Sequence, residues 1–238
     1  PEFGGAIGLA LFLALALSVP FYILGFAEAL VRTFPALTPH FLPITLATAA
    51  VLFALAFVGA GWAIRAQFVI MLFLVLAIVA FLGGAAARFS SATFLENLRP
   101  DYTTPPGGAP YSFWLIFAIF FPAVTGFTQG VSMSGDLRDP GRSIPSGTFM
   151  AVALSIAVYV AAAILLAGSA PQQSLAEDYA VMRNVSMGGW MIVLGVVAAT
   201  LSSALASFMG APRILQSLAA YRIFPVLRPF VRGVGPKR

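Results

Sequence analysis

The sequence predicts an all-α polytopic membrane protein, and three observations support this fold class. Hydrophobic residues occupy 60% of the 238 positions and charged residues 9%, whereas soluble domains are about half apolar and about a quarter charged. Uncharged stretches of about 20 residues, long enough to cross a bilayer as a helix, recur along the chain. Segments that alternate polar and apolar residues, as membrane strands do, are absent. This composition excludes a soluble globular domain.

Six membrane-spanning helices are predicted, and together they should form one transmembrane domain over residues 1–238. They lie at approximately residues 4–30, 41–64, 66–87, 112–137, 146–168 and 188–220. Only Arg65 separates the second helix from the third, so we expect a tight helical hairpin there. The segments 88–111 and 168–187 are polar and rich in Pro, Gly and Ser, and the four prolines of the first predict an irregular loop.

The distribution of basic residues predicts which helix ends face the cytoplasm. Loops on one side of the membrane carry Arg65, Arg138, Arg142, Arg213, Arg222, Arg228, Arg232, Lys237 and Arg238, and loops on the other carry Arg32, Arg88, Arg99 and Arg183. Cytoplasmic loops are enriched in Lys and Arg, so the first helix should run from inside to outside. We therefore expect a multi-pass protein of the cell membrane with its C-terminal basic end in the cytoplasm.

Several kinds of site are excluded by what the sequence lacks. Without cysteine there is no thiolate metal site or thiol nucleophile, and the single histidine, His40, lies in a loop between two apolar stretches. No paired carboxylates fall within a predicted helix, so an intramembrane enzyme is not expected. The net charge of +5 comes from scattered basic residues, which indicates membrane topology rather than nucleic-acid binding. Because the chain starts at Pro1 with no basic segment before its first apolar stretch, we expect no cleavable signal and a piece of a longer protein.

The fourth predicted helix contains a sequence that favours a break in the middle of the membrane. Pro122 removes a backbone donor, and Gly126 and Gly130 permit conformations that other residues avoid. One interpretation is a simple proline kink, which membrane helices tolerate. The other is an unwound helix, in which free carbonyls of one half attract a cation and free amides of the other half attract an anion.

A charged segment follows this helix and contains Asp136, Arg138, Asp139 and Arg142. The simpler interpretation is a cytoplasmic connector. The alternative is a gate whose Asp and Arg side chains form ion pairs in one state of the protein. Without further evidence the connector is favoured.

Two further groups of polar residues lie on helix faces. In the sixth helix Ala199, Ser202 and Ser203 are spaced i, i+3 and i+4, and their hydroxyl and carbonyl oxygens suit a small hard cation. Small residues at this spacing are equally typical of helix–helix contacts in membranes. In the first helix Tyr22 either belongs to the interfacial aromatic belt or directs its phenol oxygen at a cation, whereas Glu28 should be exposed near the headgroups.

Three segments resemble the cation-chloride cotransporter family. FAIFFPAVTGFTQGVSMSGDLRDPGRSIPSGT, residues 117–148, is similar to the family's sixth helix and the loop after it. ATLSSALASFMGAPRILQSL, residues 199–218, is similar to its eighth helix, and FYILGFAEAL, residues 21–30, to its third. The chain thus resembles helices three to eight of this family, which belongs to the amino acid–polyamine–cation transporter superfamily.

The resemblance implies a partial five-plus-five inverted-repeat transporter fold with a discontinuous fourth span. It implies secondary active, electroneutral symport of chloride with sodium, potassium or both by alternating access, with no cofactor beyond the transported ions. By motif, potassium would bind at Tyr22, Pro122 and Thr125, chloride at Gly126, Phe127 and Thr128, and sodium at Ala199, Ser202 and Ser203. The intact serine pair and Tyr22 together favour a sodium-potassium-chloride cotransporter.

Other interpretations stay open at this point. The family's first broken helix and its tenth helix have no counterpart here, so the segment alone is not expected to transport. An amino acid or polyamine permease would share the architecture, and a non-transporting remnant or accessory protein is the third alternative. The expected partners are membrane lipid and inorganic ions, with a homodimer left open and nucleic acid excluded.

Overall fold

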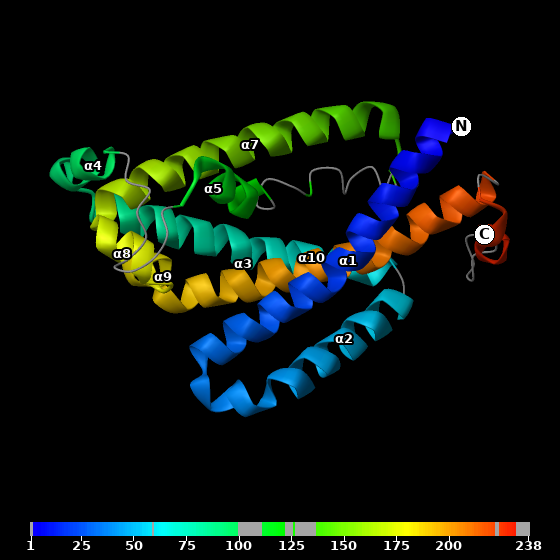
Figure 1. Cartoon of the computed structure of the whole chain (residues 1–238), viewed down its shortest axis with the longest axis horizontal. Coiled ribbons are helices and arrows are strands. Elements are labelled where there is room, and N and C mark those ends of the chain that lie inside the picture. Colours follow the sequence, from blue (N-terminus) through cyan, green and yellow to red (C-terminus); the bar gives the residue numbers. More distant parts are fainter. Residues whose placement is uncertain are drawn as a thin grey trace. The chain divides into compact units, whose positions relative to one another are not determined.

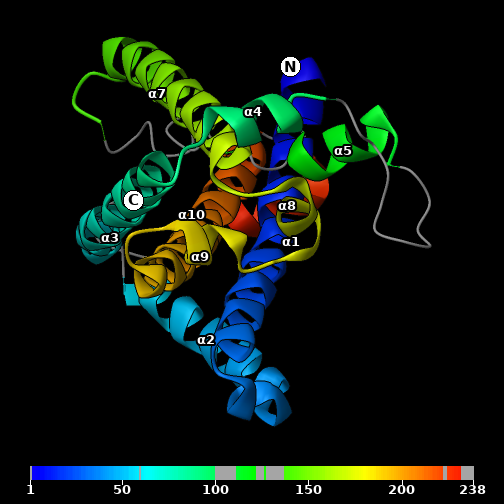
Figure 2. The same cartoon turned by 90° about the vertical axis from the view of Figure 1, so that its left-hand side faces the viewer.

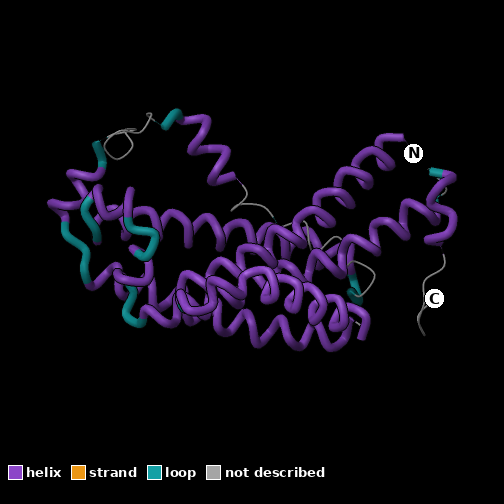
Figure 3. The backbone as a smooth tube through the Cα atoms, turned by 60° about the horizontal axis from the view of Figure 1, so that its bottom comes forward, coloured by secondary structure: helices purple, strands orange, loops and turns teal. Residues whose placement is uncertain are grey.

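The computed structural model describes residues 2–58, 60–99, 111–121, 126, 137–221 and 224–231. Within these ranges the regular elements are helices, and strands are absent (Figure 3). Five helices of the described ranges are long and apolar enough to cross a membrane, and they cover Phe3–Thr33, Pro35–Phe57, Arg65–Ala87, Pro140–Ser169 and Gly189–Ala220. The predicted all-α polytopic membrane architecture is therefore confirmed.

The chain divides into two compact units, of which the first contains Pro1–Leu72 and Val196–Arg238. Its elements are α1 (Glu2–Thr33), the 3-10 helix η1 (Pro35–His40), α2 (Phe41–Val58), the start of α3 (Ala60–Ala87), the larger part of α10 (Gly189–Ala220) and the 3-10 helix η4 (Pro225–Val231). Figure 1 shows α1 and α2 folded back on one another through η1, in agreement with the contacts between them.

The core of the first unit joins three of its helices. Ile23 of α1, Leu52 of α2, and Ala204 and Leu205 of α10 are buried together. Alanine at position 204 is fully buried, and a small side chain there lets helix backbones approach closely, as is usual between membrane helices. This cluster brings the middle of α10 beside α1.

The second unit contains Phe73–Gly195. Its elements are the rest of α3, α4 (Ser91–Asn97), α5 (Phe113–Phe120), α7 (Pro140–Ser169), α8 (Gln172–Glu177), α9 (Val181–Val185) and the start of α10. Its core cluster contains the buried residues Phe81, Ala85, Ala170 and Val185. Apolar side chains from α3, α7 and α9 pack around this cluster.

The C-terminal end of α7 is closed by α4, which lies against it (Figure 2). The Nδ2 group of Asn97 donates to the carbonyl oxygens of Ala167 at 2.7 Å and Ala170 at 2.9 Å. The backbone amide of Ser90 donates to the carbonyl of Gly168 at 2.8 Å. The last carbonyls of a helix have no partner within it, so these three bonds satisfy groups that would otherwise be left unpaired.

A glycine allows the segment after α9 to contact α3 directly. The amide of Met187 donates to the carbonyl of Ala80 at 3.0 Å, which holds the two backbones together. A Cβ atom added to Gly84 would lie under 3.0 Å from backbone atoms of Val185 and Met187. Backbone cannot move aside as a flexible side chain can, so this contact requires glycine at position 84.

Two helix ends lie at other positions than the approximate span ends expected from the sequence. The structure describes α3 from Ala60, so Arg65 lies inside α3 and does not separate two helices. A single arginine interrupts an apolar stretch but is itself a good helix former. The fifth spanning helix, α7, begins at Pro140 rather than near residue 146, because the Asp139 carboxylate accepts from the amide of Arg142 at 3.3 Å and caps it.

The loop predicted as irregular over 88–111 is also partly helical. Ser90 accepts from the amide of Thr93 at 3.4 Å and caps α4, and the four prolines of this segment lie outside the described residues. The polar segment 168–187 contains the short helices α8 and α9. The expectation of a single transmembrane domain stays a prediction.

Candidate ion-binding site

The fourth predicted span begins as a helix and is not helical at Gly126. Ser112 caps α5 by accepting from the amide of Leu115 at 3.2 Å, and the helix ends at Phe120. Gly126 has a φ of +98°, which an α-helix does not contain. This finding agrees with the predicted discontinuity and not with a helix that continues through Gly126. Four of the predicted site residues, Pro122, Thr125, Phe127 and Thr128, lie outside the described residues.

Glycine is favoured at position 126 by the backbone conformation and not by a close contact with another residue. A Cβ atom added there would meet nothing within 4 Å. The positive φ alone disfavours any residue with a side chain, because the Cβ atom would approach the residue's own backbone. The break therefore depends on local conformation at this position.

Tyr22 is half-buried in α1 and packs against the core of the first unit. Leu201 of α10 packs against the same core. One turn along α1, a Cβ atom added to Gly25 would lie 3.7 Å from the Cγ2 atom of Thr200. The structure thus brings the α1 segment that contains Tyr22 close to the α10 segment that contains the predicted sodium ligands.

The three predicted sodium ligands, Ala199, Ser202 and Ser203, are all half-buried within α10. Ser202 makes two hydrogen bonds to one side chain, that of Gln67 in α3. Its hydroxyl donates to Gln67 Oε1, and its backbone carbonyl accepts from Gln67 Nε2 at 3.3 Å. The face of α10 that carries Ala199, Ser202 and Ser203, called the serine face below, is thus in contact with α3 through the carboxamide of Gln67.

Gln67 is a polar residue of this region that our sequence interpretation missed. A signal was present, because Gln67 is the only polar side chain between Arg65 and Arg88 in an otherwise apolar stretch. Polar groups inside membrane helices are costly and usually have a specific partner. The identity of that partner, 135 positions away, could not be read from the sequence.

The acidic residues that the structure describes do not form a metal site. No group of three or more His, Cys, Asp or Glu side chains gathers within the described ranges. Glu28 forms an ion pair with Arg32 at 2.6 Å and is exposed, as expected for a residue that closes the first helix. Asp139 acts as the helix cap described above, which is a structural role for part of the charged segment.

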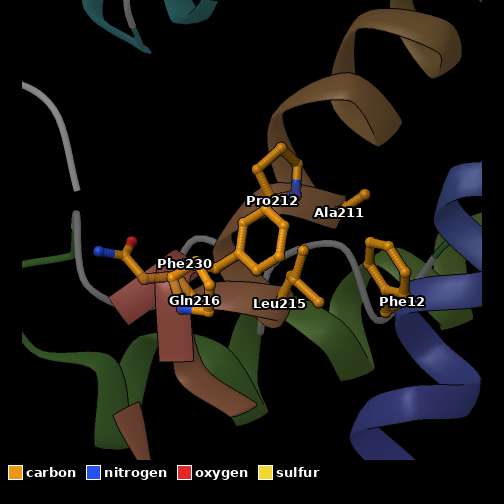
Figure 4. A pocket seen from close by; sticks show the side chains of 7 residues that line it. Phe12, Ala211, Pro212, Leu215, Gln216 and Phe230 are labelled. Atoms are coloured by element: carbon orange, nitrogen blue, oxygen red, sulfur yellow. The ribbon is translucent and has the colours of Figure 1, made fainter. Parts of the chain in front are cut away.

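A pocket of the first unit has an apolar lining that does not suit an ion. It has a volume of about 430 Å³ and lies between α1, the end of α10 and η4. Figure 4 shows Phe12, Pro212, Leu215 and Phe230 around it, with Gln216 at one side. No charged residue lines this pocket.

Known proteins with similar sequences are membrane solute carriers. Residues 1–237 match the family model described as amino acid permease. Solute carrier family 12 member 1 of Mus musculus is 32% identical over 99% of this chain and 26% of its own length. Solute carrier family 12 member 8 of Mus musculus is 31% identical over 100% of this chain and 34% of its own length. Solute carrier family 12 member 2 of Squalus acanthias is 33% identical over 99% of this chain and 24% of its own length.

These matches extend along the whole chain, although the chain spans about a quarter to a third of the length of the curated relatives. They agree with the long apolar helices and with the motifs around Gly126 and Ser202. The chain belongs to the amino acid permease family, a family of transporters and not of enzymes, and is similar along its whole length to members of solute carrier family 12.

Proposed function

We propose that the complete protein is a secondary active, electroneutral symporter that couples chloride to sodium, potassium or both by alternating access. The observation that carries this proposal is the non-helical backbone at Gly126, inside the segment that resembles the cotransporter motif. A helix interrupted within the membrane offers carbonyl oxygens to a cation and amide groups to an anion. One interruption can therefore bind both ions of a neutral salt.

The site residues follow from the motif. Tyr22, Pro122 and Thr125 would hold potassium with oxygen atoms that replace its water, and Gly126, Phe127 and Thr128 would hold chloride with backbone amides. Ala199, Ser202 and Ser203 would hold sodium, because hydroxyl and carbonyl oxygens are the ligands that hard cations prefer. The intact Ser202–Ser203 pair and Tyr22 favour the use of both sodium and potassium.

The proposed setting is the cell membrane, with the basic C-terminal end in the cytoplasm. The excess of basic residues in alternate loops supports this orientation. The proposed partners are membrane lipid and the transported ions, with a second copy of the chain as the remaining partner and no role for nucleic acid.

The test is uptake of rubidium, a potassium substitute, by cells that express the complete coding sequence. Uptake should fall toward the level of untransfected cells when chloride is replaced by gluconate, and likewise in a separate measurement in which sodium is replaced by choline. Uptake that is indifferent to chloride would refute the proposal.

Two substitutions address the cation sites in the same assay. Ser203→Ala should raise the sodium concentration that gives half-maximal uptake, and Tyr22→Phe should raise the corresponding potassium concentration, because each removes a ligand oxygen. Thr48→Val is a matched control, since the Thr48 hydroxyl donates to the carbonyl of Ile44 in its own helix. Unchanged ion dependence in both variants would remove these two assignments.

A second candidate function is an amino acid or polyamine permease. The match of residues 1–237 to the amino acid permease model favours it, because the same half-helix ends can hold the carboxylate and amine of a zwitterion. Uptake of labelled amino acids that unlabelled substrate competes away, together with rubidium uptake independent of chloride, would select this alternative.

A further inference from the structure

The bond between Gln67 and Ser202 differs from the other hydroxyl bonds described in the spanning helices. The hydroxyls of Thr45 and Thr48 donate to carbonyls of their own helix at 2.8 Å, and that of Thr200 does so at 2.9 Å. Such bonds satisfy a hydroxyl within one turn and leave it without a role between helices. The Ser202 hydroxyl instead donates to a side chain of another helix.

The partners of the carboxamide determine which of its atoms faces which group. The carbonyl oxygen of Ser202 can only accept, so the NH₂ group of Gln67 must face it, at 3.3 Å. The Oε1 atom of Gln67 then faces the Ser202 hydroxyl and can only accept. The hydroxyl must therefore be the donor, and its proton is held toward α3.

This arrangement has a direct consequence for cation binding. A hydroxyl that binds a cation must turn a lone pair toward the ion and its proton away from it. In an apolar environment that proton needs an acceptor, because an unpaired polar group there is costly. Gln67 supplies the acceptor, and the oxygen lone pairs of Ser202 remain free to face a cation.

We propose that Gln67 is a positioning residue for a sodium ion bound at the Ser202–Ser203 face of α10. Gln67 does not contact the ion but holds the Ser202 hydroxyl with its lone pairs available. This inference deepens the proposed function and rests on the sodium assignment within it. Without Gln67, the Ser202 hydroxyl should rotate to donate to the preceding turn of α10, as Thr200 does.

The experiment measures sodium binding without transport. The complete protein is purified in detergent, and its melting temperature is followed as sodium replaces choline at constant chloride and constant ionic strength. An ion that binds the folded state raises the melting temperature with concentration. Gln67→Met, which keeps the size of the side chain and removes both hydrogen bonds, should raise the half-maximal sodium concentration about tenfold, as expected from loss of about one good hydrogen bond.

A double-variant comparison separates positioning from a general structural effect. If Gln67 acts through Ser202, the sodium dependence of Ser202→Ala should not worsen further when Gln67→Met is added. Gln216→Met is the matched control, because Gln216 donates to Val231 at the far end of α10 and should leave the sodium dependence unchanged. If Gln67→Met does not fold, Gln67→Asn, which shortens the carboxamide by one methylene, should show the same shift.

The outcomes distinguish the two proposals. Unchanged sodium dependence in Gln67→Met, or effects of Gln67→Met and Ser202→Ala that multiply, would overturn the role of Gln67. Wild-type protein that sodium does not stabilise would overturn both the role of Gln67 and the sodium assignment. Rubidium uptake that is indifferent to chloride would overturn the cotransport proposal while leaving a measured sodium shift, and the role of Gln67, in place.

Discussion

Replacement of Asn97 by alanine should destabilise the second unit by removing the closure of α7. Asn97 donates to Ala167 and Ala170, and Ala170 is only 5% exposed. A typical hydrogen bond contributes about 1 kcal/mol, and a buried partner left unsatisfied costs about 1–3 kcal/mol. The two lost bonds together predict a decrease of about 2–4 kcal/mol in the free energy of unfolding.

The assay is unfolding of the detergent-solubilised chain by sodium dodecyl sulfate, followed by circular dichroism. Asn97→Asp is the sharper variant, since aspartate has the same shape but an ionised carboxylate cannot donate and would face two carbonyl oxygens. It should be at least as destabilised as Asn97→Ala. Asn184→Ala is the matched control, because the bond from Asn184 to Asp178 is exposed and its loss should cost about 1 kcal/mol or less. Equal losses for Asn97→Ala and Asn184→Ala, or a wild-type value for Asn97→Asp, would refute the reasoning.

Two further predictions use the same unfolding assay. Gly84→Ala should lower the free energy of unfolding by about 1–3 kcal/mol, because its new Cβ atom would overpack against backbone. Gly83→Ala should be neutral or stabilising, since its new Cβ atom would meet only the flexible Met187 side chain at 3.2 Å. A Gly84 variant as stable as the Gly83 variant would contradict the close approach of the two backbones. Asp139→Ala should lose about 1 kcal/mol through the missing cap of α7, while Asp139→Asn should retain most of it. If Asp139→Asn loses as much free energy of unfolding as Asp139→Ala, the stabilisation comes from the Asp139 charge and not from its capping oxygen.

The long helices could be predicted from the sequence, because a helix that crosses the bilayer must be apolar over the thickness of the hydrocarbon core. About 20 consecutive apolar residues satisfy this condition, and α1, α3 and α10 show this directly. The ends of helices follow a different condition. Arg65 marks the end of an apolar stretch, yet α3 starts at Ala60, and α7 starts at Pro140 before its apolar stretch begins. Charge locates the membrane surface, whereas caps locate the helix end.

The contacts between distant segments could not be predicted from the sequence. Nothing around Asn97 indicates that it bonds to Ala167, 70 positions later at the end of α7, and nothing around Gln67 indicates that it bonds to Ser202. For the candidate site, the spacing of Ala199, Ser202 and Ser203 was sufficient to define a shared face. It could not tell an ion ligand from a packing surface, because both uses favour the same small residues.

The pairing of Glu28 with Arg32 has a consequence for biogenesis. The two charges lie one turn apart in α1, so their attraction needs no second helix and exists as soon as that turn is wound. A nascent segment that neutralises itself in this way carries a smaller penalty as it leaves the insertion machinery. The cost of placing these two charges at the end of α1 is therefore reduced before the distant α10 has been synthesised.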